Sequence, residues 1–219
     1  MKLYKTKKNC GKLLLGILAF CTGMKLLTGC GSSSEQKQNK HEETAEENKE
    51  EDKVQIGLTV DSFVIERWIR DRDVFVATAR ELGAEVNVQD AGADVKEQIS
   101  QIEYFISKQV DVIVVIARDC GALSDAIQKA QSAGIPVISY DRMVNNANTD
   151  LYISFDNRKV GEIMAQALVN ALPQGGDVFM IQGSSSDNNV RMVKQGFDDM
   201  LADTDLHVVY EANCDGWTA

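Results

Sequence analysis

Polar side chains and two tryptophans recur at one kind of position in this sequence, directly after apolar segments that predict strands. They are Asp61, Arg67, Trp68, Asp90, Arg118, Asp119, Asp141, Arg142, Asp187, Asn188, Asn189, Asp215 and Trp217. The loops that precede the strands are short and chemically bland. Carboxylates, amides and guanidinium groups can pair with neighbouring hydroxyls two at a time, and an indole covers an apolar C–H face. This set of side chains predicts a site for a neutral sugar.

Several of these residues also have a purely structural interpretation. Trp68 could be a large apolar anchor of the core. Asp141 and Arg142 could form an exposed turn whose ion pair is worth under about 1 kcal/mol. Asp187 could cap the helix that follows it, alone or in addition to a role at the site. The interpretations differ in where the side chains must point.

Enzyme chemistry finds little support in the sequence. The histidines are His41, in a polar tract, and His207, on a predicted strand, and no Gly-x-Ser-x-Gly motif occurs. A dinucleotide enzyme needs a glycine-rich turn after its first strand, where this chain has Asp61, Ser62 and Phe63. The pattern also lacks a metal-ligand cluster, so we expect a protein that is not an enzyme and needs no cofactor.

Short Val- and Ile-rich runs alternate with segments of helical period. The predicted strands are residues 54–60, 85–89, 112–117, 136–140, 151–155, 178–182 and 206–211, and the predicted helices are residues 66–82, 94–108, 122–133, 159–172 and 190–201. On the first helix we expect Phe75, Ala79 and Leu82 to face inward. This alternation predicts an α/β fold with doubly wound parallel sheets, in which ligands bind at the carboxyl ends of the strands.

The first thirty residues have the pattern of an export signal. Its positive charges are Lys2, Lys5, Lys7, Lys8 and Lys12. An apolar stretch over residues 13–20 follows, too short for a membrane span, and residues 27–30 read LTGC. This resembles a bacterial lipoprotein signal, so we expect removal of residues 1–29, acylation of Cys30 and anchoring to the outer face of the cell membrane. The alternative is an ordinary secretory signal with an incidental cysteine.

Residues 30–53 are rich in Ser, Gln, Lys and Glu and predict a flexible polar stalk. The net charge of the chain is −10, and six of its basic residues but none of its acidic ones lie in the first thirty positions. Nucleic acid is therefore excluded as a partner, because phosphate binding needs a basic face. Cys120 and Cys214 remain in the folded part, where free thiols are expected rather than a disulfide.

A family resemblance rests on a series of short motifs in order. They are residues 57–61 (GLTVD), 66–68 (ERW), 71–73 (DRD), 140–143 (YDRM), 152–157 (YISFDN), 159–162 (KVGE), 187–189 (DNN) and 215–217 (DGW). Together they resemble the D-xylose-binding periplasmic-type proteins of sugar ABC transporters. The resemblance implies two α/β lobes, with residues 54–153 forming the first and residues 154–219 part of the second.

The same resemblance implies roles for individual residues. Arg67, Asp141 and Arg142 would hydrogen-bond sugar hydroxyls from the first lobe, and Trp68 would stack on the ring. Asp187 and Asn189 would reach from the second lobe, with Trp217 on the opposite face of the sugar. Because Trp68 and Arg142 are predicted to face the cleft, their replacement by alanine should weaken binding with little loss of stability.

The resemblance also implies the ligand and the partner. The ligand would be D-xylose or a related pentose or hexose, and the bound protein would dock on an ABC permease or, alternatively, on the outer domain of a membrane histidine kinase. Members of the family continue beyond residue 219, so we expect a C-terminally truncated chain. Such a chain is expected to bind sugar more weakly than a complete member, or not at all.

Overall fold

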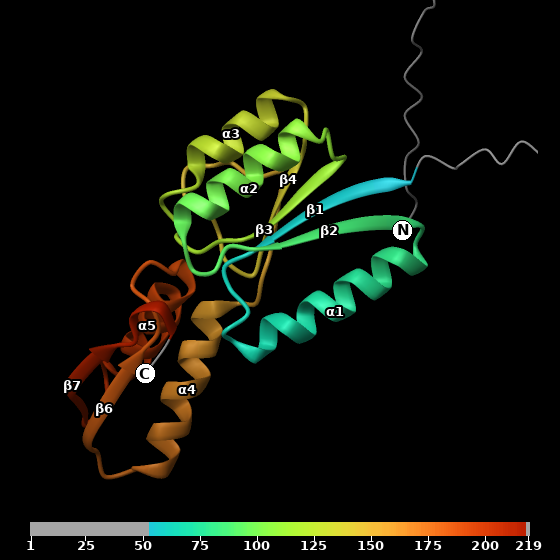
Figure 1. Cartoon of the computed structure of the whole chain (residues 1–219). Coiled ribbons are helices and arrows are strands. Elements are labelled where there is room, and N and C mark those ends of the chain that lie inside the picture. The colour runs from blue at the N-terminus through green and yellow to red at the C-terminus, as the bar shows by residue number, and fades with distance from the viewer. Residues whose placement is uncertain (1–52, 218–219) are drawn as a thin grey trace, which may run out of the picture. The chain divides into compact units, whose positions relative to one another are not determined.

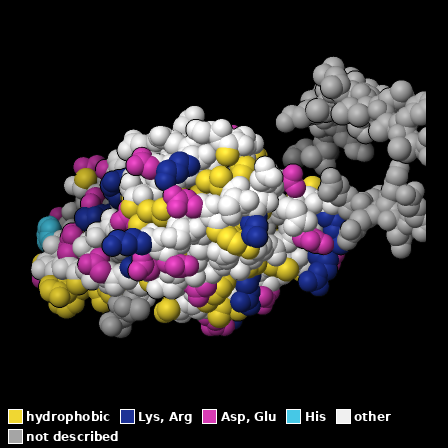
Figure 2. Space-filling view, turned by 45° about the horizontal axis from the view of Figure 1, so that its top comes forward, with side chains coloured by type: hydrophobic (Ala, Val, Ile, Leu, Met, Phe, Trp, Pro, Cys, Tyr) yellow, Lys and Arg dark blue, Asp and Glu magenta, His cyan; other side chains and the backbone are white. Residues whose placement is uncertain are grey.

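The computed structural model describes residues 53–217. The predicted signal peptide, Cys30 and all of the predicted stalk except Lys53 lie outside these residues. Within them, no helix has both the length and the apolar character that a membrane crossing requires. On the face shown in Figure 2, acidic and basic side chains alternate, and the described residues form no continuous basic surface there.

The larger sheet has five parallel strands in the order β2-β1-β3-β4-β5. These strands are β1 (Val54–Val60), β2 (Ala84–Asp90), β3 (Val112–Ile116), β4 (Val137–Tyr140) and β5 (Leu151–Ile153). Helix α1 (Glu66–Glu81) covers one face, and α2 (Val95–Ser107) and α3 (Ser124–Ser132) cover the other (Figure 1). We call residues 54–153 the large-sheet part. Because its five strands are parallel, their carboxyl ends meet at one edge of the sheet.

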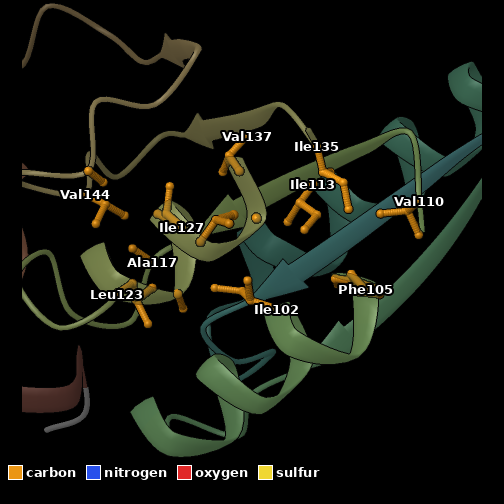
Figure 3. Close-up of a cluster of buried hydrophobic side chains, with 14 residues drawn as sticks. Ile102, Phe105, Val110, Ile113, Ala117, Leu123, Ile127, Ile135, Val137 and Val144 are labelled. Carbon is orange, nitrogen blue, oxygen red and sulfur yellow. The ribbon is translucent and has the colours of Figure 1, made fainter. Parts of the chain in front are cut away.

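Each face of the larger sheet has its own apolar core. On the α2 and α3 side, Ile102, Phe105, Ile113 and Ile127 are fully buried (Figure 3). A Cβ atom at Gly57 would lie only 2.6 Å from the Phe105 ring, so glycine in β1 lets this ring lie against the strand. Burial of such a side chain contributes roughly 1.5–3 kcal/mol. The core thereby fixes the strands whose ends carry the polar residues.

A second, two-stranded parallel sheet follows along the chain. It pairs β6 (Gly176–Gln182) with β7 (Leu206–Asn213), and α4 (Asn157–Ala171), α5 (Asn188–Leu201) and a 3-10 turn (Asp215–Trp217) complete what we call the small-sheet part. Helices α4 and α5 approach closely at two glycines. A Cβ at Gly161 would lie 1.9 Å from the Val193 carbonyl oxygen, and one at Gly196 would lie 2.0 Å from the Arg158 carbonyl oxygen. This contact packs the amino-terminal turns of α4 against the middle of α5.

The predicted strands and helices all form, and the α/β fold with parallel sheets is confirmed. One prediction about a helix face is wrong. Leu82 is 81% exposed instead of facing inward with Phe75 and Ala79. The reason is local, since α1 ends at Glu81 and the chain turns at Gly83, whose φ is +80°. The helical periodicity therefore stops applying one residue earlier than the sequence suggests.

Candidate functional site

The carboxyl ends of the strands surround a cavity of about 720 Å³. Every residue to which the family resemblance assigns a role at the sugar site lines it: Arg67, Trp68, Asp141, Arg142, Asp187, Asn189 and Trp217. These residues come from both sheet parts and are separated by up to 150 positions in the chain. The structure thus brings the predicted set together, while its role in binding stays a prediction.

Arg142 lies at the centre of the polar contacts. Its Nη1 donates to Asp61 Oδ2 at 2.6 Å and to the Ala117 carbonyl oxygen at 3.1 Å, and its Nε lies 2.8 Å from Asp187 Oδ2. The side chains of Arg142, Asp61 and Asp187 are all at most 3% exposed. Two carboxylates therefore share one buried guanidinium group. The interpretation of Arg142 as part of an exposed turn is wrong.

Asp141 occupies a strained backbone position. Its φ is +62°, and the Arg142 N–H donates to the Tyr140 carbonyl oxygen at 2.7 Å. These three residues form a γ-turn with positive φ, an uncommon conformation for a residue with a side chain. The turn directs two consecutive polar side chains into one cavity, since Asp141 Oδ2 accepts from Arg67 Nη2 at 2.6 Å.

The small-sheet part meets Asp141 through Asn189. Asn189 Nδ2 donates to Asp141 Oδ1 at 3.0 Å and to its carbonyl oxygen at 3.1 Å. Tyr152 Oη donates to the same Asp141 carbonyl oxygen at 3.2 Å. A second contact lies outside the cavity lining, where the Cys120 N–H donates to the Ser186 carbonyl oxygen at 3.0 Å. The two sheet parts are therefore in direct polar contact around the cavity.

Asp187 caps a helix and also lines the cavity. It is the N-cap of α5, where its Oδ1 accepts from the Asn189 N–H at 2.8 Å. Its other carboxylate oxygen faces Arg142. Burial raises the pKa of Asp187 above its ordinary value, although the positive charge of Arg142 opposes the rise. The structure places a desolvated carboxylate where a hydroxyl could donate to it.

The two indoles differ in their surroundings. Trp68 is 2% exposed, packs with Leu58 and Val60, and also lines the cavity, so it is a core residue while its stacking on a ligand stays a prediction. Its Nε1 has no hydrogen-bond partner. Trp217 is 37% exposed, and its ring lies against Gly183, where a Cβ would come within 2.2 Å of it. The Arg142 guanidinium carbon lies 5.4 Å from the Trp68 ring centroid and 5.6 Å from that of Trp217.

Several lining residues escaped the sequence analysis. Phe155 lies under the Arg67 guanidinium at 5.0 Å, and the strand expected to include it ends at Ile153. The cavity also extends over apolar side chains of α4, β6 and α5, including Met164, Met180 and Val193. Apolar residues at helical or strand spacing look like ordinary core in a sequence. Only their place in the cavity lining distinguishes them.

The remaining polar candidates lie outside the cavity lining. Arg118 Nη1 is 3.6 Å from Asp61 Oδ1, and Asp119 Oδ1 accepts from the Gly121 N–H at 2.7 Å. Cys120 and Cys214 are free thiols and half-buried. Burial raises the pKa of Cys120, and Asp119 adds to the rise. Among residues 53–217, no group of three or more His, Cys, Asp or Glu side chains could hold a metal ion.

Comparison with known proteins gives a family. A model of the periplasmic binding protein domain matches residues 56–219. This chain belongs to the periplasmic binding protein family. Like the type I members among its structural neighbours, this periplasmic binding protein has α/β architecture with parallel sheets.

Two relatives of this periplasmic binding protein are named D-xylose-binding periplasmic proteins. The one from Haemophilus influenzae is 43% identical over 170 residues, covering 76% of this chain and 51% of the relative. The one from Escherichia coli is 44% identical over 168 residues, covering 75% of this chain and 51% of the relative. The chain therefore spans about half the length of the relatives that it matches.

A solved structure agrees with the fold. It is an ABC transporter solute binding protein from Clostridium phytofermentans with bound β-D-glucose, with a TM-score of 0.67 and 29% identity. The match covers 70% of this chain and 51% of that one.

Proposed function

We propose that this periplasmic binding protein binds a monosaccharide, D-xylose in the first place, in the cavity between its two sheet parts. The observation that carries the proposal is the convergence of two indoles and several forked polar groups on one cavity. Arg67, Asp141 and Asn189 supply donors and acceptors that suit adjacent hydroxyls. Relatives named for D-xylose binding support this choice of sugar.

In this proposal the two sheet parts act as lobes, residues 54–153 and 154–219, that close on the sugar. Trp68 and Arg142 belong to the first lobe, and Asp187 and Trp217 to the second. The indoles would cover the apolar faces of the ring, while Arg142 and Asp187 would bind its hydroxyls. Closure of this kind is a hinge movement that a ligand favours by contacting both lobes at once.

The closed, loaded protein would deliver its sugar to an ABC permease. A neighbour in the solved structures is described as an ABC transporter solute binding protein, which supports this partner. The outer domain of a membrane histidine kinase is the alternative partner. Neither a cofactor nor catalysis is part of the proposal.

The sugar specificity is tested by calorimetric titration of the full chain with D-xylose, D-ribose, D-glucose and L-arabinose. We expect saturable heat with D-xylose at the lowest concentration of the four. Equal heats for all four sugars would contradict the choice of D-xylose. No heat with any of them up to millimolar concentrations would contradict sugar binding by this chain.

We also propose that Cys30 is acylated and holds the protein at the outer face of the cell membrane. We expect Cys30→Ser to abolish incorporation of labelled palmitate and to move the protein from the membrane fraction to the soluble fraction. Cys21→Ser, within the predicted leader, is the matched control and should leave both unchanged. Palmitate labelling that survives in Cys30→Ser would contradict the proposed anchor.

The surroundings of Asp187 predict that sugar affinity falls at low pH, a fall that we call the acid limb. The carboxylate is the form that accepts hydroxyl protons and pairs with Arg142, and burial raises its pKa. Sugar affinity should be constant at neutral pH and fall as the pH drops through that pKa, beginning above the value near 3.9 of an ordinary aspartate. The stability of the sugar-free protein should depend on pH in the opposite direction. A carboxyl whose pKa is raised in the folded state loses its contribution to stability as the pH rises through that pKa.

The measurement is the dissociation constant for D-xylose as a function of pH. Asp187→Asn keeps an N-cap residue but removes the titrating group. We expect this variant to bind D-xylose more weakly and to show no acid limb. An identical limb in wild type and Asp187→Asn would assign the titration to another group.

A further inference from the structure

We propose that Asp61, which does not line the cavity, is a positioning residue that holds the Arg142 guanidinium in place for Asp187 of the small-sheet part. The inference rests on the proposed sugar-binding function and adds a residue that acts through another. Asp61 was singled out by its place after the first strand, but neither the motif comparison nor the cavity lining gives it a role.

The topology explains why Asp61 can reach Arg142. Strand β1 lies inside the sheet, between β2 and β3, so the residue that follows it is covered on both sides. Asp61 is 1% exposed, and its Oδ2 accepts from Arg142 Nη1 at 2.6 Å. The Ala117 carbonyl oxygen, which follows β3, accepts from the same Nη1 at 3.1 Å. The large-sheet part therefore holds Nη1 of the guanidinium by two hydrogen bonds.

A different nitrogen of the same guanidinium contacts the small-sheet part. Arg142 Nε faces Asp187 Oδ2 at 2.8 Å. If the two parts separate, Asp187 moves away from Arg142, whereas Asp61 and Ala117 stay with it because they belong to the same sheet. Asp61 would thus keep Arg142 in its orientation whether or not Asp187 is present.

The charge of Asp61 is directed mainly at Arg142. Its second oxygen, Oδ1, has no hydrogen-bond partner and lies 3.6 Å from Arg118 Nη1. A buried arginine without a nearby carboxylate would be costly, and a neutral amide at position 61 could replace the hydrogen bond but not the charge. Asp61 and Asp187 therefore compete electrostatically for one cation.

This competition gives a signature that simple packing would not produce. The charged groups facing Asp187 are Arg142, Asp141 and Asp61, with the titratable Cys120 and Tyr152 also close enough to interact with it. Burial is the main cause that raises the Asp187 pKa, and the negative charges of Asp141 and Asp61 add to the rise. Removal of the Asp61 charge should consequently lower the pKa of Asp187.

The test is Asp61→Asn, compared with wild type in D-xylose titrations across pH. We expect the affinity at neutral pH to fall about 30-fold or more, as when one partner of a buried charge pair is lost, and the acid limb to move to lower pH. Asp111→Asn is the matched control, because Asp111 Oδ2 accepts from the Gln55 N–H at the opposite edge of the sheet. The control should change neither quantity. A loss of affinity without movement of the acid limb would overturn the proposal.

A measurement without sugar separates this inference from the proposed function. The Asp187 carboxyl is titrated by carbon NMR, assigned by its disappearance in Asp187→Asn. A lower Asp187 pKa in Asp61→Asn shows that the charge of Asp61 acts at the Arg142–Asp187 pair, as the proposal requires, even if neither protein binds D-xylose, in which case only the sugar assignment fails. An unchanged pKa overturns it.

Should Asp61→Asn fail to fold, Asp61→Glu provides the decision. It retains the charge but adds one methylene, so it should displace Arg142 and weaken binding while the acid limb stays near its wild-type position. Unchanged affinity in a folded Asp61→Glu would contradict the proposal.

Discussion

Arg142→Ala is expected to lower the free energy of unfolding by about 3–5 kcal/mol and to abolish measurable binding of D-xylose. The stability loss arises because Asp61 and Asp187 would lose the guanidinium that compensates them in a buried site, the usual penalty for breaking such a pair. The binding loss arises because Arg142 is placed to donate to the sugar and to join the two sheet parts. Chemical denaturation and calorimetric titration measure the two effects.

This expectation revises the one drawn from the sequence, in which Arg142 faces the cleft and its removal spares stability. Because the Arg142 side chain is only 3% exposed and paired with buried carboxylates, its removal should lower stability substantially. Arg80→Ala, an exposed arginine on α1, is the matched control and should change stability by no more than about 0.5 kcal/mol. An Arg142→Ala protein as stable as the Arg80→Ala protein would contradict the buried network.

The two tryptophans should separate stability from binding. Trp68→Ala removes a fully packed indole and should cost about 3–5 kcal/mol of stability, in place of the small loss expected from the sequence. Trp217→Ala removes a ring that is 37% exposed and should cost distinctly less. Both should weaken D-xylose binding by roughly tenfold or more, because an aromatic anchor of a binding site is typically worth at least about 1.4 kcal/mol.

Thermal unfolding and titration of the two variants form one experiment, in which each variant is the control of the other. Equal stability losses would show that Trp217 is a core residue like Trp68. Undiminished affinity in Trp217→Ala would remove that indole from the proposed site.

Much of the fold follows from local pattern. The strand at Val54–Val60 has the predicted bounds, because a short apolar run beside polar loops has few other stable uses. Gly83 and Gly134, both with φ of +80°, follow helices that end within one residue of the predicted ends. Leu82 is the exception, since periodicity alone cannot tell whether the last residue of a pattern is still helical.

The site was predictable as a set of positions and not as a network. Parallel strands bring their carboxyl ends to one edge, so Asp141 and Asp187 were expected near each other. Which oxygen faces which nitrogen depends on strand order and on the γ-turn at Asp141, and neither is encoded in a short motif. Asp61 shows this clearly, because its partner Arg142 is 81 positions away and is reached only across β3.

The central claim is that a sugar binds beside both indoles, and intrinsic fluorescence tests it most directly. The chain contains only two tryptophans, Trp68 and Trp217, and both line the cavity. Titration with D-xylose should change the tryptophan emission saturably, and Trp68→Phe and Trp217→Phe should each remove part of that change. A calorimetrically detected sugar that leaves the emission of both tryptophans unchanged would contradict the account.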